Sequence, residues 1–441
     1  MSVAPSCRFL QHAVVAAFVL LLPLAGRAQV IGEVMHGDGF EHDPSIQADL
    51  DALQGAHAEA LQGLFGVGGP AAPLTITYIG KGQRREGDAY EAPALGVAST
   101  PSPAFGGVSA FNPDSGNEFR IELADSDLID IEAETARIGR QNPAGPNGDP
   151  SPTDDPDTPV PGRATPKAWS NNSDNRVLRS SLTEGTTTWP WRAIAEHSNR
   201  CTGILVGPRH IVTAGHCLYN RTTNAWASGY FVTPGRAGGN WSYGRSRVPT
   251  AGQFAWYFTP WQWRQANPSG GSGHYDFGIV VLPDRLGDQT GWMGYATLGN
   301  SDLQNGFVVN RGFPWCNAVD QNGNTRTDDV GDDPLSGLTC QDRHLWGDAS
   351  SCSIGNFHDL DGDQWARRFD HSCDASAGQS GSPLYTYLNG VPAVIGVHTT
   401  SLCNKTAADV PCQPTDQRPL RATRITPEYR AWISYFRNWK P

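Results

Sequence analysis

From about Val177 to the C-terminus, short runs of β-branched and apolar residues alternate with turns rich in Gly and Asn. Examples of these runs are "CTGILVG", "HIVTAG", "FGIVVL" and "AVIGVHTT". Many short strands separated by such turns are typical of an all-β sandwich or barrel. The 50 Gly and 33 Pro among 441 residues agree with a chain that has many turns and few long helices. We therefore predict an all-β fold for this part of the chain.

One helix is predicted at the very end of the chain, in "TPEYRAWISYFRNW". Thr426 is a suitable N-cap, and Pro427 fits the first helical position. Apolar side chains then follow at helical spacing, namely Tyr429, Trp432, Ile433 and Phe436. This pattern predicts a C-terminal α-helix.

The first 28 residues have the organisation of a signal peptide. Arg8 marks a charged start, residues 13–24 form an apolar core, and small residues up to Ala28 offer a cleavage point. The apolar run is too short for a membrane helix, and no later segment of spanning length follows. We expect cleavage near Ala28 and a secreted protein, extracellular or periplasmic if the source is Gram-negative, with no membrane association afterwards.

Two further segments precede the strand-rich part. Residues 29–139 have a mixed composition with one strand-like acidic stretch, "NEFRIELADSDLIDIEAE", and we expect a largely irregular pro-region there. Residues 140–176 are rich in Pro, Gly and Asp and poor in apolar side chains, so they cannot bury enough surface to become ordered. The predicted organisation is therefore signal peptide 1–28, pro-region 29–139, disordered linker 140–176 and main domain 177–441.

The cysteines and the net charge narrow the chemistry. Of nine cysteines, Cys7 is lost with the signal peptide, and the remaining eight all lie after residue 200. An even count in an exported protein suggests disulfides, and a zinc site is the weaker alternative because no tight Cys-x-x-Cys pair occurs. Two Asp-rich segments around Asp320 and Asp361 do not fit the EF-hand pattern, so we expect no metal or other cofactor. The net charge of −11 argues against nucleic-acid partners.

The stretch "CDASAGQSGSPLY" crowds small residues around Ser380. A flexible surface loop would explain this composition, because Gly and Ser dominate turns. A nucleophilic serine would explain it too. A serine hydroxyl is a poor nucleophile at neutral pH and needs a base within hydrogen-bond reach, which in turn needs an orienting carboxylate.

Candidates for the base and the carboxylate occur earlier in the chain. His216 lies in "TAGHC" after a strand pair, and a disulfide between Cys201 and Cys217 could hold it; an ordinary buried histidine beside a cystine is the alternative. Asp276 starts the apolar strand in "GHYDFGIVVL", where an unpaired carboxylate would be costly. Its neighbour His274 is expected at the surface.

Together, "TAGHC", "YDFGIV" and "GQSGSP" resemble the chymotrypsin-like serine peptidases, in the family's order of His, Asp and Ser. The resemblance is closer to the bacterial glutamyl endopeptidases, where the Cys-Thr-Gly strand, the "GHC" turn, a "YDF" carboxylate and an amide residue before the serine recur together. It covers roughly residues 176–441. It implies a double six-stranded antiparallel β-barrel with the site between the barrels, followed by the C-terminal helix.

The resemblance also implies roles for these residues. His216 would be the general base, Asp276 its orienting carboxylate and Ser380 the nucleophile. The backbone N–H groups of Gly378 and Ser380 would hold the oxyanion.

Activation differs from that of trypsin relatives. They carry Asp immediately before the serine, where it pairs with a new N-terminal amine, and here that place is Gln379. We therefore expect a zymogen whose pro-region acts differently, through an N-terminus created after Arg176.

Three residues bear on specificity, and they point in different directions. His398 lies where glutamyl endopeptidases place a His that receives a Glu carboxylate. Asp374 lies six residues before Ser380, where trypsin relatives place the carboxylate that selects Arg or Lys. Ala375 replaces the Thr that is usual in the glutamyl pattern. Cleavage after Glu or Asp is the favoured prediction, cleavage after Arg or Lys is the alternative, and His398 as a packed residue beside the pocket remains a third interpretation.

The predicted function is that of a secreted, monomeric serine endopeptidase acting on polypeptides. A rival from another class is an inactive, protease-like secreted binding protein. Such proteins usually lack a member of the triad, whereas His216, Asp276 and Ser380 are all present here.

Overall fold

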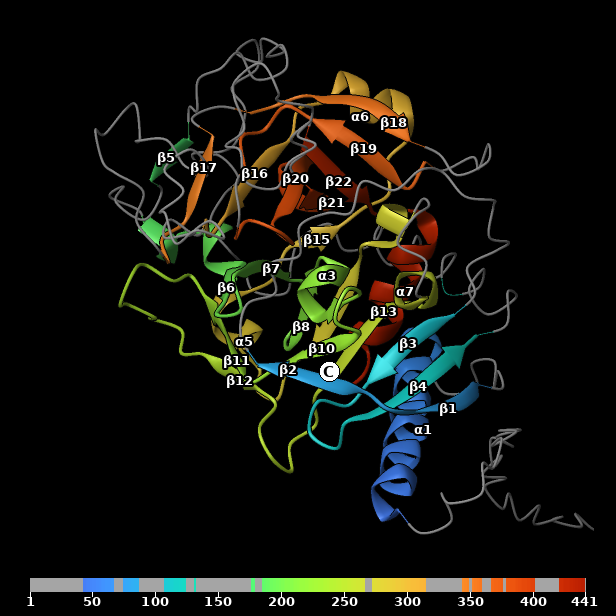
Figure 1. The fold of residues 1–441 in the computed structure, drawn as a ribbon. Helices are drawn as coiled ribbons and strands as arrows, with labels where there is room; N and C mark the ends of the chain where they lie inside the picture. The colour runs from blue at the N-terminus through green and yellow to red at the C-terminus, as the bar shows by residue number, and fades with distance from the viewer. Residues whose placement is uncertain are drawn as a thin grey trace, which may run out of the picture.

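The computed structural model describes residues 43–66, 74–86, 107–123, 131, 176–178, 185–265, 272–314, 343–348, 351–358, 366–375, 378–400 and 420–440. Two large β-sheets, built almost entirely of antiparallel pairs, form its body, and Figure 1 shows one above the other with helix α7 at their side. The prediction of a mostly β fold with a C-terminal helix is confirmed. The paired sheets are the arrangement of a double β-barrel.

The first sheet has ten strands in the order β1-β4-β3-β13-β14-β8-β7-β6-β11-β12. Their bounds are β1 Thr75–Lys81, β3 Val108–Phe111, β4 Asn117–Glu122, β6 Ile194–His197, β7 Cys201–Leu205, β8 His210–Thr213, β11 Tyr230–Pro234, β12 Ser246–Val248, β13 Trp256–Pro260 and β14 Gly278–Val281. The apolar runs that the sequence predicts as strands form β7, β8 and β14, and every residue of β7 and β14 is buried.

The second sheet follows the order β18-β19-β22-β21-β20-β16-β17-β5, with β15 pairing β21 beside this path. Its strands are β5 Arg176–Leu178, β15 Gly294–Tyr295, β16 Val309–Gly312, β17 Trp346–Asp348, β18 Ile354–His358, β19 Arg368–His371, β20 Pro383–Leu388, β21 Val391–Thr400 and β22 Leu420–Arg424. A small third sheet joins β2 Gln83–Glu86, β10 Ala225–Ser228 and β9 Tyr219–Asn220.

The helices in the described part of the chain are few, as the Gly and Pro content indicates. They are α1 Pro44–Phe65, α3 Gly215–Leu218, α4 Trp261–Arg264, α5 Gly287–Thr290, α6 Asn300–Asn305 and α7 Pro427–Arg437, with 3-10 turns at Gly185–Thr187, Trp191–Ala193 and Ser272–Tyr275. The hydroxyl of Thr426 accepts the N–H of Tyr429 and caps α7, and Pro427 occupies its first turn, so both predictions for this helix are confirmed. No helix in the described part of the chain is long and apolar enough to cross a membrane.

The expectation of a largely irregular pro-region is wrong for the residues that the structure describes. Between residues 43 and 123 the chain forms α1 and four strands, three of which extend the first sheet. Phe119 and Ile121, within the acidic stretch, are fully buried. Composition alone could not reveal this, because much of the surface that buries these strands belongs to residues after 200.

Several predictions fall outside the described residues. These are the signal peptide, the linker up to residue 175, the two Asp-rich segments around Asp320 and Asp361, and the cysteines Cys316, Cys340, Cys403 and Cys412.

Candidate active site

His216 stands on the one-turn helix α3, directly after the β7–β8 hairpin. The Cys201–Cys217 disulfide is present and ties the start of β7 to the residue after His216, with 6.0 Å between the two Cα atoms. Gly215 allows a close approach, because a Cβ atom there would lie 3.0 Å from the backbone N of Phe277. The histidine is thus held between a covalent bridge and the segment that carries Asp276.

Asp276 holds His216 with both carboxylate oxygens. Its Oδ2 lies 2.8 Å from Nδ1 of His216, and its Oδ1 accepts the backbone N–H of the same residue at 2.8 Å. Asp276 is 4% exposed and His216 is 7% exposed, so solvent screens the pair little. This bidentate grip fixes both the ring and the backbone of the histidine relative to the carboxylate.

The protonation state of Asp276 follows from opposing effects. Burial favours the neutral acid, but the charge of His216 and its two hydrogen bonds outweigh burial and lower the pKa of Asp276 below its ordinary value. The group is therefore a carboxylate at neutral pH. A carboxylate accepts a hydrogen bond from Nδ1–H, which keeps the proton on that nitrogen and leaves Nε2 of the imidazole as the basic nitrogen.

Ser380 lies on a tight turn that rests on the same hairpin. Its carbonyl oxygen accepts the backbone N–H of Thr202 in β7 at 2.8 Å. The next residue, Gly381, has φ +84°, and a Cβ atom there would overlap Thr213 of β8 and the carbonyl oxygen of Thr202. Only glycine allows this approach, which brings the Ser380 backbone next to the α3 turn, with Sγ of Cys217 at 3.6 Å from the Ser380 carbonyl.

The small residues around Ser380 form a turn that hydrogen bonds hold in a defined conformation. Gly378 has φ +92°, and its carbonyl accepts the hydroxyl of Thr202 at 3.0 Å. Between Gly378 and Ser382, Ser380 alone is half-exposed while its neighbours are buried. Within the described ranges no acceptor takes the N–H of Gly378 or of Ser380. Donors of this kind suit a developing oxyanion.

His398 lies on β21, and its backbone is joined to the serine turn. The N–H of Gly381 donates to the His398 carbonyl at 2.7 Å, and the N–H of His398 donates to the Ser382 carbonyl at 2.9 Å. The His398 side chain is buried, and its Nδ1 lies 3.1 Å from Nε2 of His371 on the neighbouring part of the sheet. Burial and the nearby His398 push the pKa of His371 well below its usual range, so His371 is neutral.

Asp374 and Ala375 follow β19 and are half-buried. The backbone N–H of Asp374 donates to both oxygens of Asp348, at 3.1 and 3.3 Å. The preceding residue Cys373 forms a disulfide with Cys352, with Cα atoms 5.1 Å apart. This segment is therefore anchored by its backbone and by a second disulfide.

Comparison with known proteins agrees with this geometry. The family described as "Trypsin-like peptidase domain" matches residues 201–397, which hold His216, Asp276 and Ser380. This stretch of the chain is therefore similar to a trypsin-like peptidase domain. A glutamyl endopeptidase of Bacillus licheniformis is 27% identical over 264 residues, which are 58% of this chain and 65% of that protein. The chain thus spans just under two thirds of the length of this relative.

Other similar proteins match this chain over a shorter stretch or at lower identity. An extracellular metalloprotease of Bacillus subtilis is 32% identical over 138 residues, covering 29% of this chain and 39% of that protein. A solved Glu endopeptidase in complex with MPD is 21% identical at a TM-score of 0.42, covering 60% of this chain and 96% of its own. The protease Anisep of Arthrobacter nicotinovorans is 16% identical at a TM-score of 0.34, covering 53% and 90%.

The name of the B. subtilis relative raises the question of a metal. Two groups of close metal-ligating side chains occur among the described residues, namely Cys201, His216 and Cys217, and Asp348, Cys352 and Cys373. In each group both cysteines are joined in a disulfide. A cysteine binds a metal as a thiolate, which a disulfide sulfur cannot supply, so neither group as described offers three metal ligands.

Three features of the site were not found from the sequence. His371 lies 27 residues from His398, and only the pairing of distant strands brings the two rings together. The Cys352–Cys373 pairing could not be deduced from spacing. His274 was expected at the surface but is buried, because its turn packs against Arg368, and burial lowers its pKa to about 3.

Proposed function

We propose that this protein is a secreted, trypsin-like serine endopeptidase that uses His216, Asp276 and Ser380. The observation that carries the proposal is the grip of the Asp276 carboxylate on Nδ1 and on the backbone of His216, next to a serine turn fixed to the same hairpin. A flexible loop at Ser380 would not need these contacts. An inactive binding protein would not need an ionised, buried carboxylate oriented toward a histidine.

The reaction follows from these positions. Asp276 keeps the Nδ1 proton in place, so that Nε2 of His216 accepts the proton of the Ser380 hydroxyl as its oxygen attacks the scissile carbonyl. The N–H groups of Gly378 and Ser380 stabilise the oxyanion. His216 then protonates the leaving amine, and a water molecule repeats the sequence to hydrolyse the acyl-enzyme.

For the substrate, the proposal is cleavage after Glu or Asp, and it rests on His398. His371 is neutral, so its Nε2 can accept a hydrogen bond from Nδ1 of His398. The 3.1 Å contact between the rings orients His398, and its backbone bonds couple it to the serine turn. A protonated imidazole in this position would attract a substrate carboxylate. The alternative is cleavage after Arg or Lys through Asp374.

Activation by cleavage after Arg176 also belongs to the proposal. Arg176–Leu178 forms β5, the edge strand of the second sheet, and the backbone of residue 176 lies opposite that of Asp348 in β17. A protease could reach this bond once one short edge strand leaves β17, and the rest of the sheet would be undisturbed. We expect the uncut chain to be weakly active and the mature N-terminus to be Val177.

A fluorophosphonate probe and a peptide-library digest test the proposal together. The probe should label Ser380 and no other serine, and the library should show cleavage after Glu or Asp. Labelling without any peptide cleavage would favour the binding-protein interpretation. Cleavage after Arg or Lys that survives His398→Ala and disappears in Asp374→Ala would favour the trypsin-like alternative.

A further inference from the structure

We propose that the N-terminal module, defined as the described residues 43–66, 74–86 and 107–123, is a lasting partner of the peptidase body, defined as residues 185–440. In this proposal the module remains bound after the chain is cut between the two parts, and the mature protein is a two-chain particle. The inference concerns association, so it does not rest on the proposed peptidase activity.

The module continues a sheet of the body. Strand β3 pairs with β13 over four residue pairs, from Tyr257↔Phe111 to Pro260↔Val108, and β13 pairs with β14. Strand β14 begins two residues after Asp276. Strand β2 also pairs with β10 over four residue pairs. Loss of the module would leave β13 as an unpaired edge one strand away from the segment that carries Asp276.

An ion pair between a buried carboxylate and a half-buried arginine fixes how the two parts fit. Glu118 of β4 is 1% exposed and accepts Nε and Nη2 of Arg264 from the body at 2.7 and 3.0 Å. The same carboxylate accepts the indole N–H of Trp226, also from the body, at 3.2 Å. Such an ion pair adds little net stability, but leaving the buried Glu118 carboxylate without its cation is unfavourable. The pair therefore acts against any other docking geometry.

Aromatic stacking covers the rest of the contact. Phe111 of the module stacks on Trp226 with ring centroids 4.8 Å apart and an interplanar angle of 1°. Phe119 lies against Trp256, and all four rings are at most 1% exposed. Removal of the module would expose this apolar face of the body to water, which monomeric proteins rarely tolerate over a large area.

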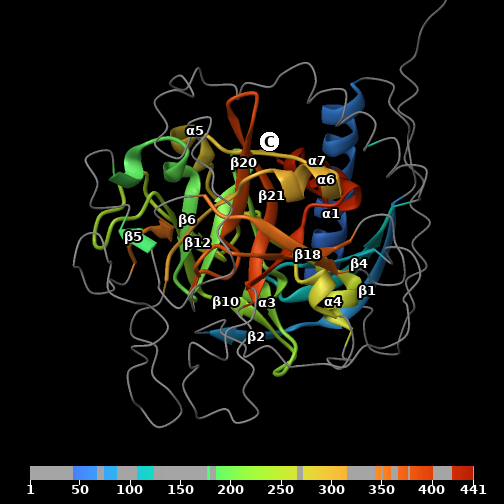
Figure 2. The same ribbon diagram turned by 90° about the horizontal axis from the view of Figure 1, so that it is seen from above.

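Helix α1 forms a second contact, with the C-terminal helix. Figure 2 shows α1 beside α7. His57 hydrogen-bonds through Nδ1 to the Tyr435 hydroxyl at 2.7 Å, and Lys440 donates to Glu59 at 2.9 Å. Gly63 faces Asn438 so closely that a Cβ atom on it would overlap that side chain. Gly55, on the same helix, has nothing within 4 Å of a Cβ atom.

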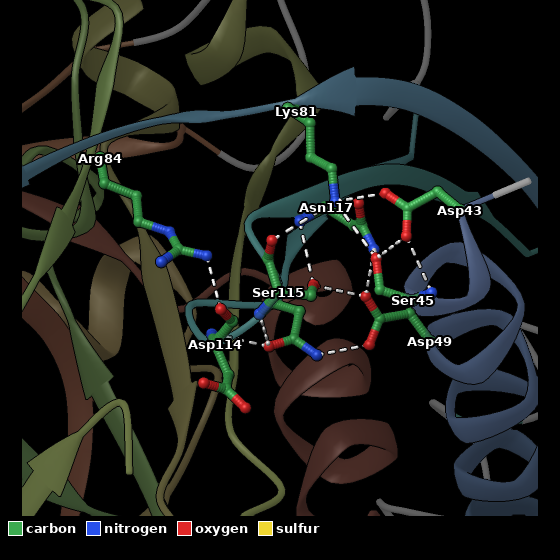
Figure 3. A network of polar contacts seen from close by, with 9 residues as sticks. Asp43, Ser45, Asp49, Lys81, Arg84, Asp114, Ser115 and Asn117 are labelled. Atoms are coloured by element: carbon green, nitrogen blue, oxygen red, sulfur yellow. Dashed lines mark hydrogen bonds and ion pairs between the residues drawn. The ribbon is translucent and has the colours of Figure 1, made fainter. Parts of the chain in front are cut away.

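The module is tied together internally, so it moves as one unit. Asp49 of α1 accepts Asn112 and Ser115 at 2.5 Å and Asn117 at 2.6 Å, all from the β3–β4 hairpin. Figure 3 shows this network together with the ion pair between Asp43 and Lys81, which joins the start of α1 to β1. Helix α1 and the strands of the module therefore bind the body as one unit, through the sheet contact and through the contact between α1 and α7.

The proposal can be tested by cutting the full chain between the module and the body and measuring whether the two fragments remain associated. A recognition sequence for a specific protease is inserted within residues 140–175, the full chain is purified and cut, and size-exclusion chromatography is followed by mass analysis. The N-terminal fragment should co-elute with the rest of the chain in native buffer and separate only in denaturant. Separate elution in native buffer would overturn the proposal.

Two matched pairs of variants locate the interface. Gly63→Leu should weaken retention of the cut fragment by about tenfold or more, whereas Gly55→Leu on the same helix should leave it unchanged. Arg264→Met should weaken retention similarly, whereas Arg285→Met, at an exposed ion pair with Asp288, should not. Circular dichroism before the cut shows whether each variant is folded. Equal retention within both pairs would overturn the assignment of these contacts to the interface.

Discussion

The two halves of the candidate active site are held in place by different kinds of contact. In the half built on the first sheet, a side chain does the holding, since the Asp276 carboxylate binds both the ring and the backbone of His216. In the half built on the second sheet, main-chain hydrogen bonds fix the Ser380 turn and His398. Within the described ranges, no hydrogen bond involves the hydroxyl of Ser380.

This difference predicts that substitutions in the two halves affect catalytic activity and fold stability differently. In the first half, the group proposed to orient the base also supports the local backbone, so a substitution there should change activity and stability together. In the second half, the reacting side chain is structurally dispensable, so a substitution should change activity alone. The predictions below test this contrast, from the largest expected effect to the smallest.

Ser380→Ala should lower kcat by about 10⁶-fold, because no nucleophile remains and only binding and oxyanion stabilisation persist. The free energy of unfolding should stay within about 0.5 kcal/mol of wild type, as for substitutions that break no structural contact. Peptide hydrolysis and urea unfolding measure the two effects. Ser242→Ala, at an exposed position, is the control and should change neither quantity. Peptide hydrolysis by Ser380→Ala at the wild-type rate would contradict the proposed role of Ser380 as the nucleophile.

Asp276→Asn should lower kcat by about 10⁴-fold, because the amide no longer holds the proton on Nδ1 of His216. Unlike Ser380→Ala, it should also destabilise the fold, since a buried charged acceptor of two hydrogen bonds is lost. Asp288→Asn, at an exposed ion pair, is the matched control. If Asp276→Asn and Ser380→Ala had the same stability, the proposed contrast between the two halves would be wrong.

What the sequence could predict depends on how local each feature is. The β7–β8 hairpin, the Cys201–Cys217 bridge around it and the capped helix α7 were predicted because each lies within a few residues of its own signal. Of the N-terminal strands, only β4 lies in a stretch that looks strand-like in the sequence, and the others were missed because their partners are distant. Glu118, for example, finds Arg264 146 residues further along the chain. Without that partner, the acidic stretch could be recognised as strand-like but not as part of a packed sheet.

The residues of the candidate site also differ in how far they could be predicted from local sequence. His216, Asp276 and Ser380 stand in short motifs that could be matched to a known family. The neutral partner of His398 could not, because His371 reaches it only through the pairing of β19, β22 and β21. Substrate specificity is therefore harder to predict from the sequence than the type of reaction. It depends on which side chains from separate strands lie in the same pocket.

His398→Gln should lower kcat/KM on Glu substrates by about 100-fold and change it far less on substrates with a neutral residue at that position. The reason is the loss of a cationic partner for the substrate carboxylate, while the backbone bonds of residue 398 to the serine turn persist. His371→Gln, which keeps a polar neighbour, should have a smaller effect in the same direction. Equal losses on Glu and neutral substrates would assign His398 a structural role only.

The smallest effect concerns pH and stability in the first sheet. His197 of β6 is fully buried, and burial lowers its pKa to about 3. Between that value and the ordinary pKa of about 6.5, the unfolded chain binds a proton at this residue and the folded chain does not, so stability is lost as pH falls below about 6.5. At pH 5 the loss is about 2 kcal/mol for this one histidine.

His197→Phe should remove this contribution to the pH dependence. Its free energy of unfolding, measured in urea, should therefore fall less between pH 7.5 and 5 than that of wild type. The comparison uses the pH-dependent change within each protein, which cancels any constant effect of repacking the ring against Tyr230. An identical pH-dependent loss in both proteins would show that His197 takes up its proton without unfolding.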